Sequence, residues 1–203
     1  MSASSSIVED IISLQKSGLA SLAFFYCDFR EDQKKDIRGL LSSLLLQLSR
    51  QSHLYRDILS DLYSEHDDGS RQPSDDTLVE CLKEILKLPR QPPVYLIIDA
   101  LDECPITASL SSRDGVLMLV AELVDSQVPN LRICVTSRVE TDIKAILSPL
   151  TFRSISLHDE SGQMEDINNY ITFVVSTDRM MQKWKTSDKQ LVIEVLTNKA
   201  DGM

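Results

Sequence analysis

The chain has 203 residues, enough for one substantial hydrophobic core and an appendage, and its 42% apolar and 26% charged residues are typical of globular proteins. A formal net charge of −10 argues against a general surface for nucleic acid or anionic membranes. The apolar runs are too short to cross a bilayer and the first residues do not resemble a signal peptide, so we expect a cytoplasmic protein that binds neither membrane nor nucleic acid.

The first ninety residues predict helices around one buried strand. Leucine and isoleucine recur every three or four positions between Ile37 and Leu48, which gives a helix one continuous apolar stripe. Such a stripe is typical of a core helix, although it can also form a contact surface. Ser74 is a good N-cap, because Asp75 and Asp76 behind it favour the positive end of a helix dipole. The expected elements are a helix over residues 7–17, a strand over 19–29, and helices over 32–51, over 54–64 and from Ser74 to before Pro89.

Residues 94–103 are the most informative stretch, because five apolar residues are followed by three carboxylates within five positions. An apolar run of this length predicts a strand buried on both faces of a parallel sheet. Ligands of such sheets bind at the carboxyl ends of the strands, where Asp99, Asp102 and Glu103 would emerge. Carboxylates there suit Mg²⁺, which is usually held by one or two carboxylates and the phosphates of a nucleotide. The bland alternative is that these acids serve solubility or helix capping.

The second half of the chain predicts two more strands separated by helices. Arg138 ends the first of these strands, where a guanidinium can contact a terminal phosphate. Strands that alternate with helices imply βαβ crossovers and a mainly parallel sheet. The expected elements are a helix over 116–124, a strand over 131–138, a short helix over 140–147, a strand over 152–157, a helix over 164–176 and a last helix capped by Ser187.

The cysteines and histidines offer no zinc-ligand spacing, since the sequence has no C-x-x-C pair and its three histidines are isolated. Cys27, Cys81 and Cys134 fall in apolar segments and are interpreted as small buried hydrophobic residues. Cys104 follows the acidic cluster and is the one cysteine for which we consider exposure. A reducing compartment fits this usage.

Two segments, YLIIDALDEC and then RICVTSR, resemble the core of a NACHT-type domain. The chain is most similar to the nephrocystin-like N-terminal domains of large fungal signalling proteins, which are signal-transduction NTPases with a three-layer α/β P-loop fold. Further segments share this likeness: SSIVEDI, LAFFYCDFRE, LLSSLLLQL, LVECLKEIL and NKADGM. The resemblance implies that Asp99 is the Mg²⁺-linked acid, Asp102 and Glu103 are catalytic acids that orient water, and Arg138 binds nucleotide as a phosphate sensor. It also implies ATP or GTP with Mg²⁺, and protein partners or self-association through NACHT-type assembly.

One motif of that family has no counterpart in this sequence. A Walker A loop requires Gly-x-x-x-x-Gly-Lys-Ser/Thr, and none of the six glycines is followed by lysine. By the resemblance we expect the chain to begin just after that loop and to lack the first, central strand of the sheet. That strand would lie between those over 131–138 and 152–157, so two apolar strand edges would stay unpaired. Residues 1–158 would then form a partial nucleotide-binding core, and 159–203 the start of a helical subdomain.

Three functions remain open. The leading hypothesis is a fragment of a NACHT-like NTPase that needs no cofactor of its own, binds little nucleotide alone and does not hydrolyse it, because unaided carboxylates repel a polyanion. The alternative is a non-catalytic module that assembles with intact NACHT proteins through the leucine-rich helix and the sheet edges. A third hypothesis is a standalone metal-dependent phosphohydrolase that uses Asp99, Asp102 and Glu103.

Overall fold

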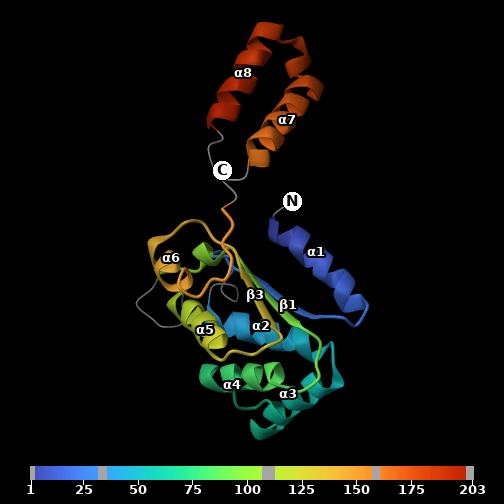
Figure 1. Ribbon diagram of the computed structural model, residues 1–203, viewed down its shortest axis with the longest axis vertical. Helices are drawn as coiled ribbons and strands as arrows, with labels where there is room; N and C mark the ends of the chain where they lie inside the picture. The colour runs from blue at the N-terminus through green and yellow to red at the C-terminus, as the bar shows by residue number, and fades with distance from the viewer. Residues whose placement is uncertain (1–2, 32–35, 107–112, 157–160, 200–203) are drawn as a thin grey trace. The chain divides into compact units, whose positions relative to one another are not determined.

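The computed structural model describes residues 3–31, 36–106, 113–156 and 161–199. The chain divides into two compact units, Met1–Thr151 and Phe152–Met203, each with its own internal packing. The larger unit is built on three parallel strands and carries the residues that the sequence analysis singles out (Figure 1). None of the described helices is both long enough and apolar enough to pass through a lipid bilayer.

The sheet has the order β1-β2-β3, so the acidic strand lies at its centre. Apolar residues occupy both faces of this strand, and most of them are buried. The register pairs Tyr26 with Asp99 and Ile98 with Val135, so the carboxyl ends of all three strands lie together at one end of the sheet. The α/β fold with a parallel sheet flanked by helices is therefore confirmed. The strands are β1 (Ser21–Tyr26), β2 (Val94–Asp99) and β3 (Leu131–Val135).

One face of the sheet is covered by the main core of the protein. The leucine stripe of α2 lies in this core, with Leu40, Leu44 and Leu48 almost inaccessible to solvent, so the stripe is not an exposed contact surface. Asp36 caps that helix by accepting a hydrogen bond from the backbone N–H of Gly39 at 2.8 Å. The helices on or next to this face are α2 (Ile37–Ser49), α3 (His53–Glu65), α4 (Asp75–Leu86), α5 (Arg113–Asp125) and α6 (Thr141–Leu147).

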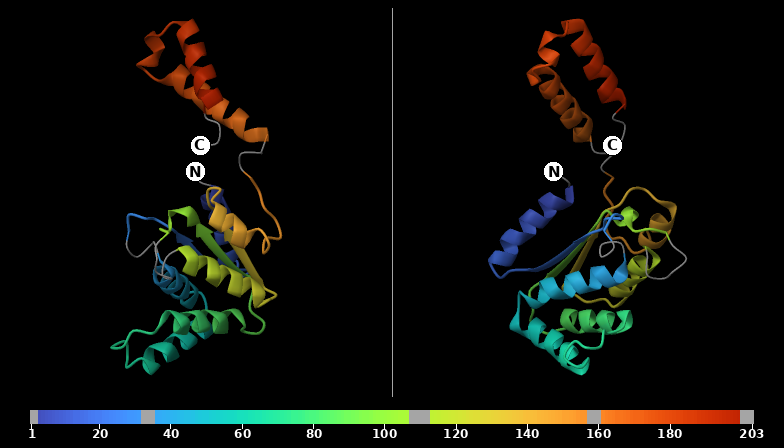
Figure 2. Two further views of the ribbon diagram at one scale, coloured as in Figure 1. Left: turned by 90° about the vertical axis from the view of Figure 1, so that its left-hand side faces the viewer. Right: turned by 180° about the vertical axis from the view of Figure 1, so that it is seen from behind.

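On the opposite face of the sheet, the described helix is α1 (Ala3–Lys16), which is seen in full in the right-hand view of Figure 2. Val8 and Ile11 of this helix pack against Leu22 and Ile97 of the first two strands. These contacts form a second, smaller cluster. On β3, Cys134 is only partly buried by this cluster, because α1 contacts β1 and β2.

The two outer strands, β1 and β3, differ in whether side chains bind the backbone groups at their outer edges. At the β1 edge, the side-chain amide of Gln51 accepts from the backbone N–H of Leu22 at 2.9 Å and donates to its carbonyl oxygen. Gln47 binds the backbone of Phe24 in the same way, at 3.0 and 2.7 Å. At the outer edge of β3, the Arg132 guanidinium donates to the carbonyl oxygen of Leu131 at 2.8 Å, and no described side chain binds the backbone of Ile133 or Val135. The β1 edge is closed to a further strand, whereas the β3 edge is open.

The predicted strand over 152–157 is wrong for the residues that the structure describes. Residues 152–156 have no strand conformation and are all exposed, while Leu157 lies outside the described ranges. An alternating apolar pattern becomes a strand only when a neighbour supplies backbone hydrogen bonds, and the described sheet consists of β1, β2 and β3 without residues 152–156. The smaller unit consists of α7 (Ser161–Thr177) and α8 (Thr186–Lys199), which contact each other, and a 3₁₀ turn at Met181–Lys183.

Candidate functional site

The acidic residues of the second strand lie on a tight turn at its carboxyl end. Strand β2 ends at Asp99, and Ala100 adopts a left-handed conformation with φ of 55°. A 3₁₀ turn over Leu101–Glu103 follows, in which the side chain of Leu101 is fully buried. A left-handed alanine costs about 1–2 kcal/mol, so the surrounding contacts must hold this turn in place.

Thr136, the first residue after β3, holds the start of the turn. Its hydroxyl donates to Asp99 Oδ1 and accepts from the backbone N–H of Ala100 at 3.0 Å. Its carbonyl oxygen accepts from the backbone N–H of Leu101, also at 3.0 Å. One threonine therefore ties the Asp99 carboxylate and the left-handed residue to the neighbouring strand.

Asp102 reaches across the same strand ends to Arg138. The backbone N–H of Arg138 donates to Asp102 Oδ1 at 3.0 Å, and the guanidinium Nε lies 3.5 Å from Oδ2. The Asp102 side chain is 10% exposed, whereas that of Arg138 is 84% exposed. The carboxylate is thus fixed in the protein, while the guanidinium stands at the surface where an anionic ligand can reach it.

Arg113, the first residue of α5, binds the main chain of the acidic turn. Its guanidinium donates to the carbonyl oxygens of Asp102 and Cys104, the latter at 3.0 Å, and to Asp142 Oδ2 at 3.1 Å. Partial burial raises the pKa of the Asp142 carboxyl, but the hydrogen bond and charge of Arg113 together with backbone hydrogen bonds outweigh this effect, and the pKa lies below its ordinary value. The buried arginine is therefore fully partnered, and it fixes the main chain of the acidic turn.

Glu103 lies beside a second ion pair at the end of β1. Arg30 forms a two-pronged contact with Asp28, with both nitrogen–oxygen distances at 2.9 Å. This contact raises the pKa of the Arg30 guanidinium, and the negative charge of Glu103 raises it further. Glu103 thus adds to the negative potential at the carboxyl ends of the strands, and among the described residues it has no direct ion pair.

The described side chains do not form a metal site by themselves. No group of three or more histidine, cysteine, aspartate or glutamate residues within these ranges is arranged to hold a metal ion. Asp99 offers a carboxylate of which one oxygen already accepts from Thr136. A single carboxylate suits Mg²⁺ only when water and nucleotide phosphates supply the other ligands.

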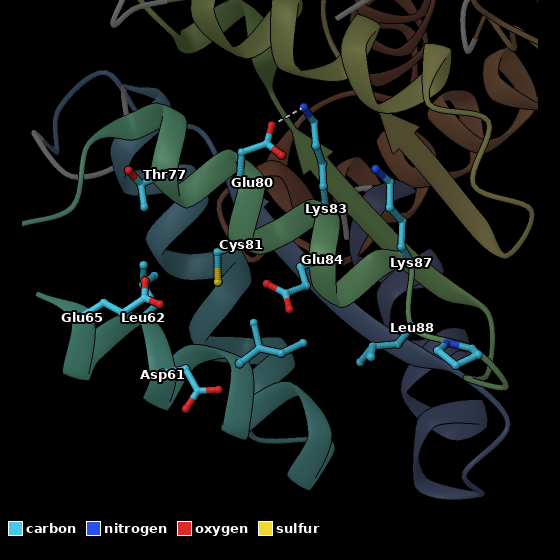
Figure 3. Close-up of a pocket in the computed structure, with 12 residues that line it drawn as sticks. Asp61, Leu62, Glu65, Thr77, Glu80, Cys81, Lys83, Glu84, Lys87 and Leu88 are labelled. Carbon is cyan, nitrogen blue, oxygen red and sulfur yellow. Dashed lines mark hydrogen bonds and ion pairs between the residues drawn. The ribbon is translucent and has the colours of Figure 1, made fainter.

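An open groove of about 650 Å³ lies elsewhere, between α3 and α4 (Figure 3). Carboxylates from both helices line it, and Lys83 pairs with Glu80 at 2.7 Å. None of Asp99, Asp102, Glu103 and Arg138 lines this groove. The candidate site is therefore a set of polar groups at the strand ends, not a preformed pocket.

The structure brings together residues that the sequence analysis placed on separate elements. Asp99 and Asp102 meet the segment Thr136–Arg138, as expected for neighbouring parallel strands. Sequence reasoning missed Arg113 and Asp142, because an arginine behind a serine-rich loop and an aspartate in a short helix both look like surface residues. The one available signal was an arginine at the start of a helix whose middle, residues 116–121, is apolar.

Comparison with known protein families gives a match. The family model described as nephrocystin 3, N-terminal, matches residues 2–138 of the chain. The matched range begins with α1, includes all three strands and ends at Arg138. A search of curated proteins finds no match.

Proposed function

Because the chain belongs to the nephrocystin 3 N-terminal family, we propose that it supplies the acidic and phosphate-sensing half of a NACHT-like nucleotide switch. In this proposal Asp99 is a ligand of a nucleotide-bound Mg²⁺, and Glu103 with Asp102 orients an attacking water. Arg138 contacts the terminal phosphate. The 203 residues contain no Gly-Lys-Ser/Thr segment, so they hold little ATP or GTP alone and do not hydrolyse it.

The observation that carries this proposal is the pairing of Asp102 with Arg138. The guanidinium Nε of Arg138 lies 3.5 Å from a carboxylate oxygen of Asp102 in the acidic turn. A terminal phosphate would compete for the same guanidinium and leave Asp102 free to bind water. The pair therefore supports a switch in which one arginine reports whether phosphate is present.

The absence of independent nucleotide binding follows from charge. Asp99, Asp102 and Glu103 lie at one strand end, and the chain carries a net charge of −10. A nucleotide polyphosphate is repelled by such a group unless a metal ion and a phosphate-binding loop compensate it. Arg138 alone contributes one exposed cation, which is too little to hold a polyanion against this field.

A second candidate function, assembly with another chain, is favoured by the open edge of β3. Ile133 and Val135 on this strand are only partly buried, while Gln47 and Gln51 close the opposite edge. A parallel strand from another protein that contains a complete nucleotide site would gain backbone hydrogen bonds here. In this reading the chain acts as a non-catalytic module.

Addition of the absent motif tests the leading proposal. A strand and a Gly-x-x-x-x-Gly-Lys-Ser loop would be joined ahead of Met1, and Mg²⁺-dependent ATP and GTP binding measured by calorimetry. We expect binding that Asp99→Asn weakens by about tenfold or more, while Asp114→Asn on the exposed side of α5 leaves it unchanged. A fused protein that folds cooperatively yet binds no nucleotide would contradict the proposal.

Size-exclusion chromatography with an intact relative tests the assembly reading. Ile133→Lys should abolish co-elution, because a charged side chain at this partly buried position of β3 opposes strand addition. Arg132→Lys, on the same strand but exposed, serves as the control. Equal co-elution of both variants would argue against the β3 edge as the contact.

A further inference from the structure

The groove between α3 and α4 has carboxylates on both of its walls (Figure 3). Asp61 and Glu65 lie on α3, and Glu80 and Glu84 lie on α4. The two members of each pair are four positions apart, a spacing that puts them on the same face of a helix. All four residues are exposed. Each wall therefore presents a row of two carboxylates to the solvent.

Cations compensate these carboxylates only in part. Lys83 donates to Glu80 at 2.7 Å and also pairs with Glu122 of α5, so its charge is already shared between two acids. The other lysine of the groove, Lys87, is exposed. The three remaining carboxylates of the walls have no ion pair among the described residues. The groove thus keeps an excess of negative charge.

The carboxylates also stand where they oppose the helices that carry them. Like charges four positions apart repel each other along a helix, and each wall holds one such pair. Glu65 is in addition the last residue of α3, where the helix dipole favours a cation and the last turn contains no basic residue. A cationic partner in the groove would relieve both kinds of repulsion.

The floor of the groove is apolar. Ile58 and Leu62 of α3 and Leu88, just after α4, line it and are only partly buried. Cys81 lines it from α4 and is buried at 5% exposure. Cys104, outside the groove, is buried as well, so the exposure considered for it from the sequence is wrong. The groove therefore offers apolar surface flanked by the carboxylates of two helices.

We propose that this groove binds a basic amphipathic helix of a partner protein. The apolar stripe of such a helix would pack on Ile58 and Leu62, and lysine or arginine residues beside the stripe would pair with the carboxylates of both walls. An extended peptide fits less well, because helices satisfy their own backbone hydrogen bonds and present no strand edge. A polycation without apolar groups would gain nothing from the floor.

This surface is separate from those considered for nucleotide and for strand addition. None of the residues of the acidic turn, Arg138 or β3 lines the groove. Binding of a helix between α3 and α4 therefore requires neither a nucleotide nor a partner at the β3 edge.

Fluorescence anisotropy of a labelled synthetic peptide with the native full chain tests the proposal. The peptide has about 18 residues, with leucine at every third or fourth position and lysine on either side of that stripe. We expect saturable binding, and Asp61→Asn combined with Glu84→Gln should raise the Kd at least about fivefold. Glu9→Gln combined with Asp10→Asn, at exposed positions of α1, removes the same charge. This control should leave the Kd unchanged at physiological salt, because charges far from the peptide are screened.

Two altered peptides separate a fitted groove from general attraction between charges. A peptide with serine in place of each leucine should not bind the native chain, a comparison that needs no protein variant. Asp61→Lys combined with Glu84→Lys should abolish binding of the lysine peptide and permit binding of one with glutamate in its place. Circular dichroism shows whether that variant is folded. Failure of the native chain to bind, equal binding of the serine peptide, or equal affinities of the two charge-neutralised variants would overturn the proposal.

Discussion

The carboxylate of Asp102 is held by Arg138, whose own side chain is largely exposed to solvent. Both its oxygens are engaged by Arg138, one by the backbone N–H at 3.0 Å and the other by the guanidinium at 3.5 Å. The backbone contact belongs to the protein framework, because it joins the ends of two neighbouring strands. The guanidinium contact is exposed and replaceable, so the two contacts should respond differently to mutation.

Substitution of Asp102 should therefore cost more stability than substitution of Arg138. We expect Asp102→Ala to lower the free energy of unfolding by about 1–2 kcal/mol, because a backbone N–H loses its charged acceptor. Arg138→Ala should cost about 0–1 kcal/mol, as for other exposed ion pairs. Urea denaturation measures both, and Asp102→Asn, which keeps an acceptor oxygen, should lie between them. The reverse order would show that the guanidinium carries the contact.

Arg113 is the residue whose loss should damage the site most. Arg113→Met should lower the free energy of unfolding by about 3 kcal/mol, because it leaves the carbonyl oxygens of Asp102 and Cys104 without their donor and breaks a pair with Asp142. Arg132→Met, at an exposed position of β3, is the control and should change it by less than about 0.5 kcal/mol. If the two substitutions lowered the free energy of unfolding equally in chemical denaturation, Arg113 would not hold the turn as described.

The Arg113–Asp142 pair predicts a specific acid sensitivity. The pKa of Asp142 is lowered in the folded state, so its contribution to stability is complete above the ordinary aspartate pKa. That contribution is lost as the pH falls through the lowered value, when the carboxyl takes up a proton. Denaturation midpoints measured from neutral to acidic pH should fall less steeply in Asp142→Asn. Parallel curves for the two proteins would contradict this assignment.

The Thr136 hydroxyl should matter more than its size. Thr136→Val keeps the shape but removes the group that binds Asp99 Oδ1 and the backbone N–H of Ala100. We expect the free energy of unfolding to fall by about 1–3 kcal/mol, because the Asp99 carboxylate and the Ala100 N–H each lose a hydrogen-bond partner. Thr136→Ser, which retains the hydroxyl, should lose less. Thermal unfolding of the two variants compares them directly, and a more stable valine variant would be inconsistent with this role.

Gln47 on α2 and Gln51, which follows the end of that helix, should prevent association through the β1 edge. The double change Gln47→Leu and Gln51→Leu frees the backbone groups of Leu22 and Phe24 and presents an unpaired strand edge. We expect concentration-dependent oligomers in analytical ultracentrifugation. Gln72→Leu, in the exposed loop before α4, is the matched control and should leave the distribution of species unchanged. A double variant that sediments like the native chain would mean that the edge is protected otherwise.

Features of the fold that depend on local patterns could be predicted from the sequence. The apolar run before Asp99 gave the central strand, the leucine stripe gave a core helix, and Ser74 caps α4 as expected. The same local reasoning failed for residues 152–156, because a strand also needs a neighbour. Local patterns do not reveal which distant side chain will reach a backbone group.

Part of the candidate site could likewise be predicted from local patterns, and part could not. Asp99, Asp102 and Arg138 follow apolar strands, and parallel strands bring such positions together. The left-handed Ala100 gave no signal, since the residue type most suited to that conformation is glycine. The contacts of Arg113 with Cys104 and Asp142 depend on packing between segments that are separate in the sequence. Only the three-dimensional arrangement could show them.

The central proposal is that this chain carries the acidic and sensing residues of a nucleotide site but does not hold a nucleotide by itself. Calorimetric titration of the native 203-residue chain with Mg²⁺-ATP tests it most directly. We predict no saturable binding up to millimolar nucleotide. Saturable binding in the micromolar range, weakened by both Asp99→Asn and Arg138→Ala, would show that these residues form a complete site and would contradict the account.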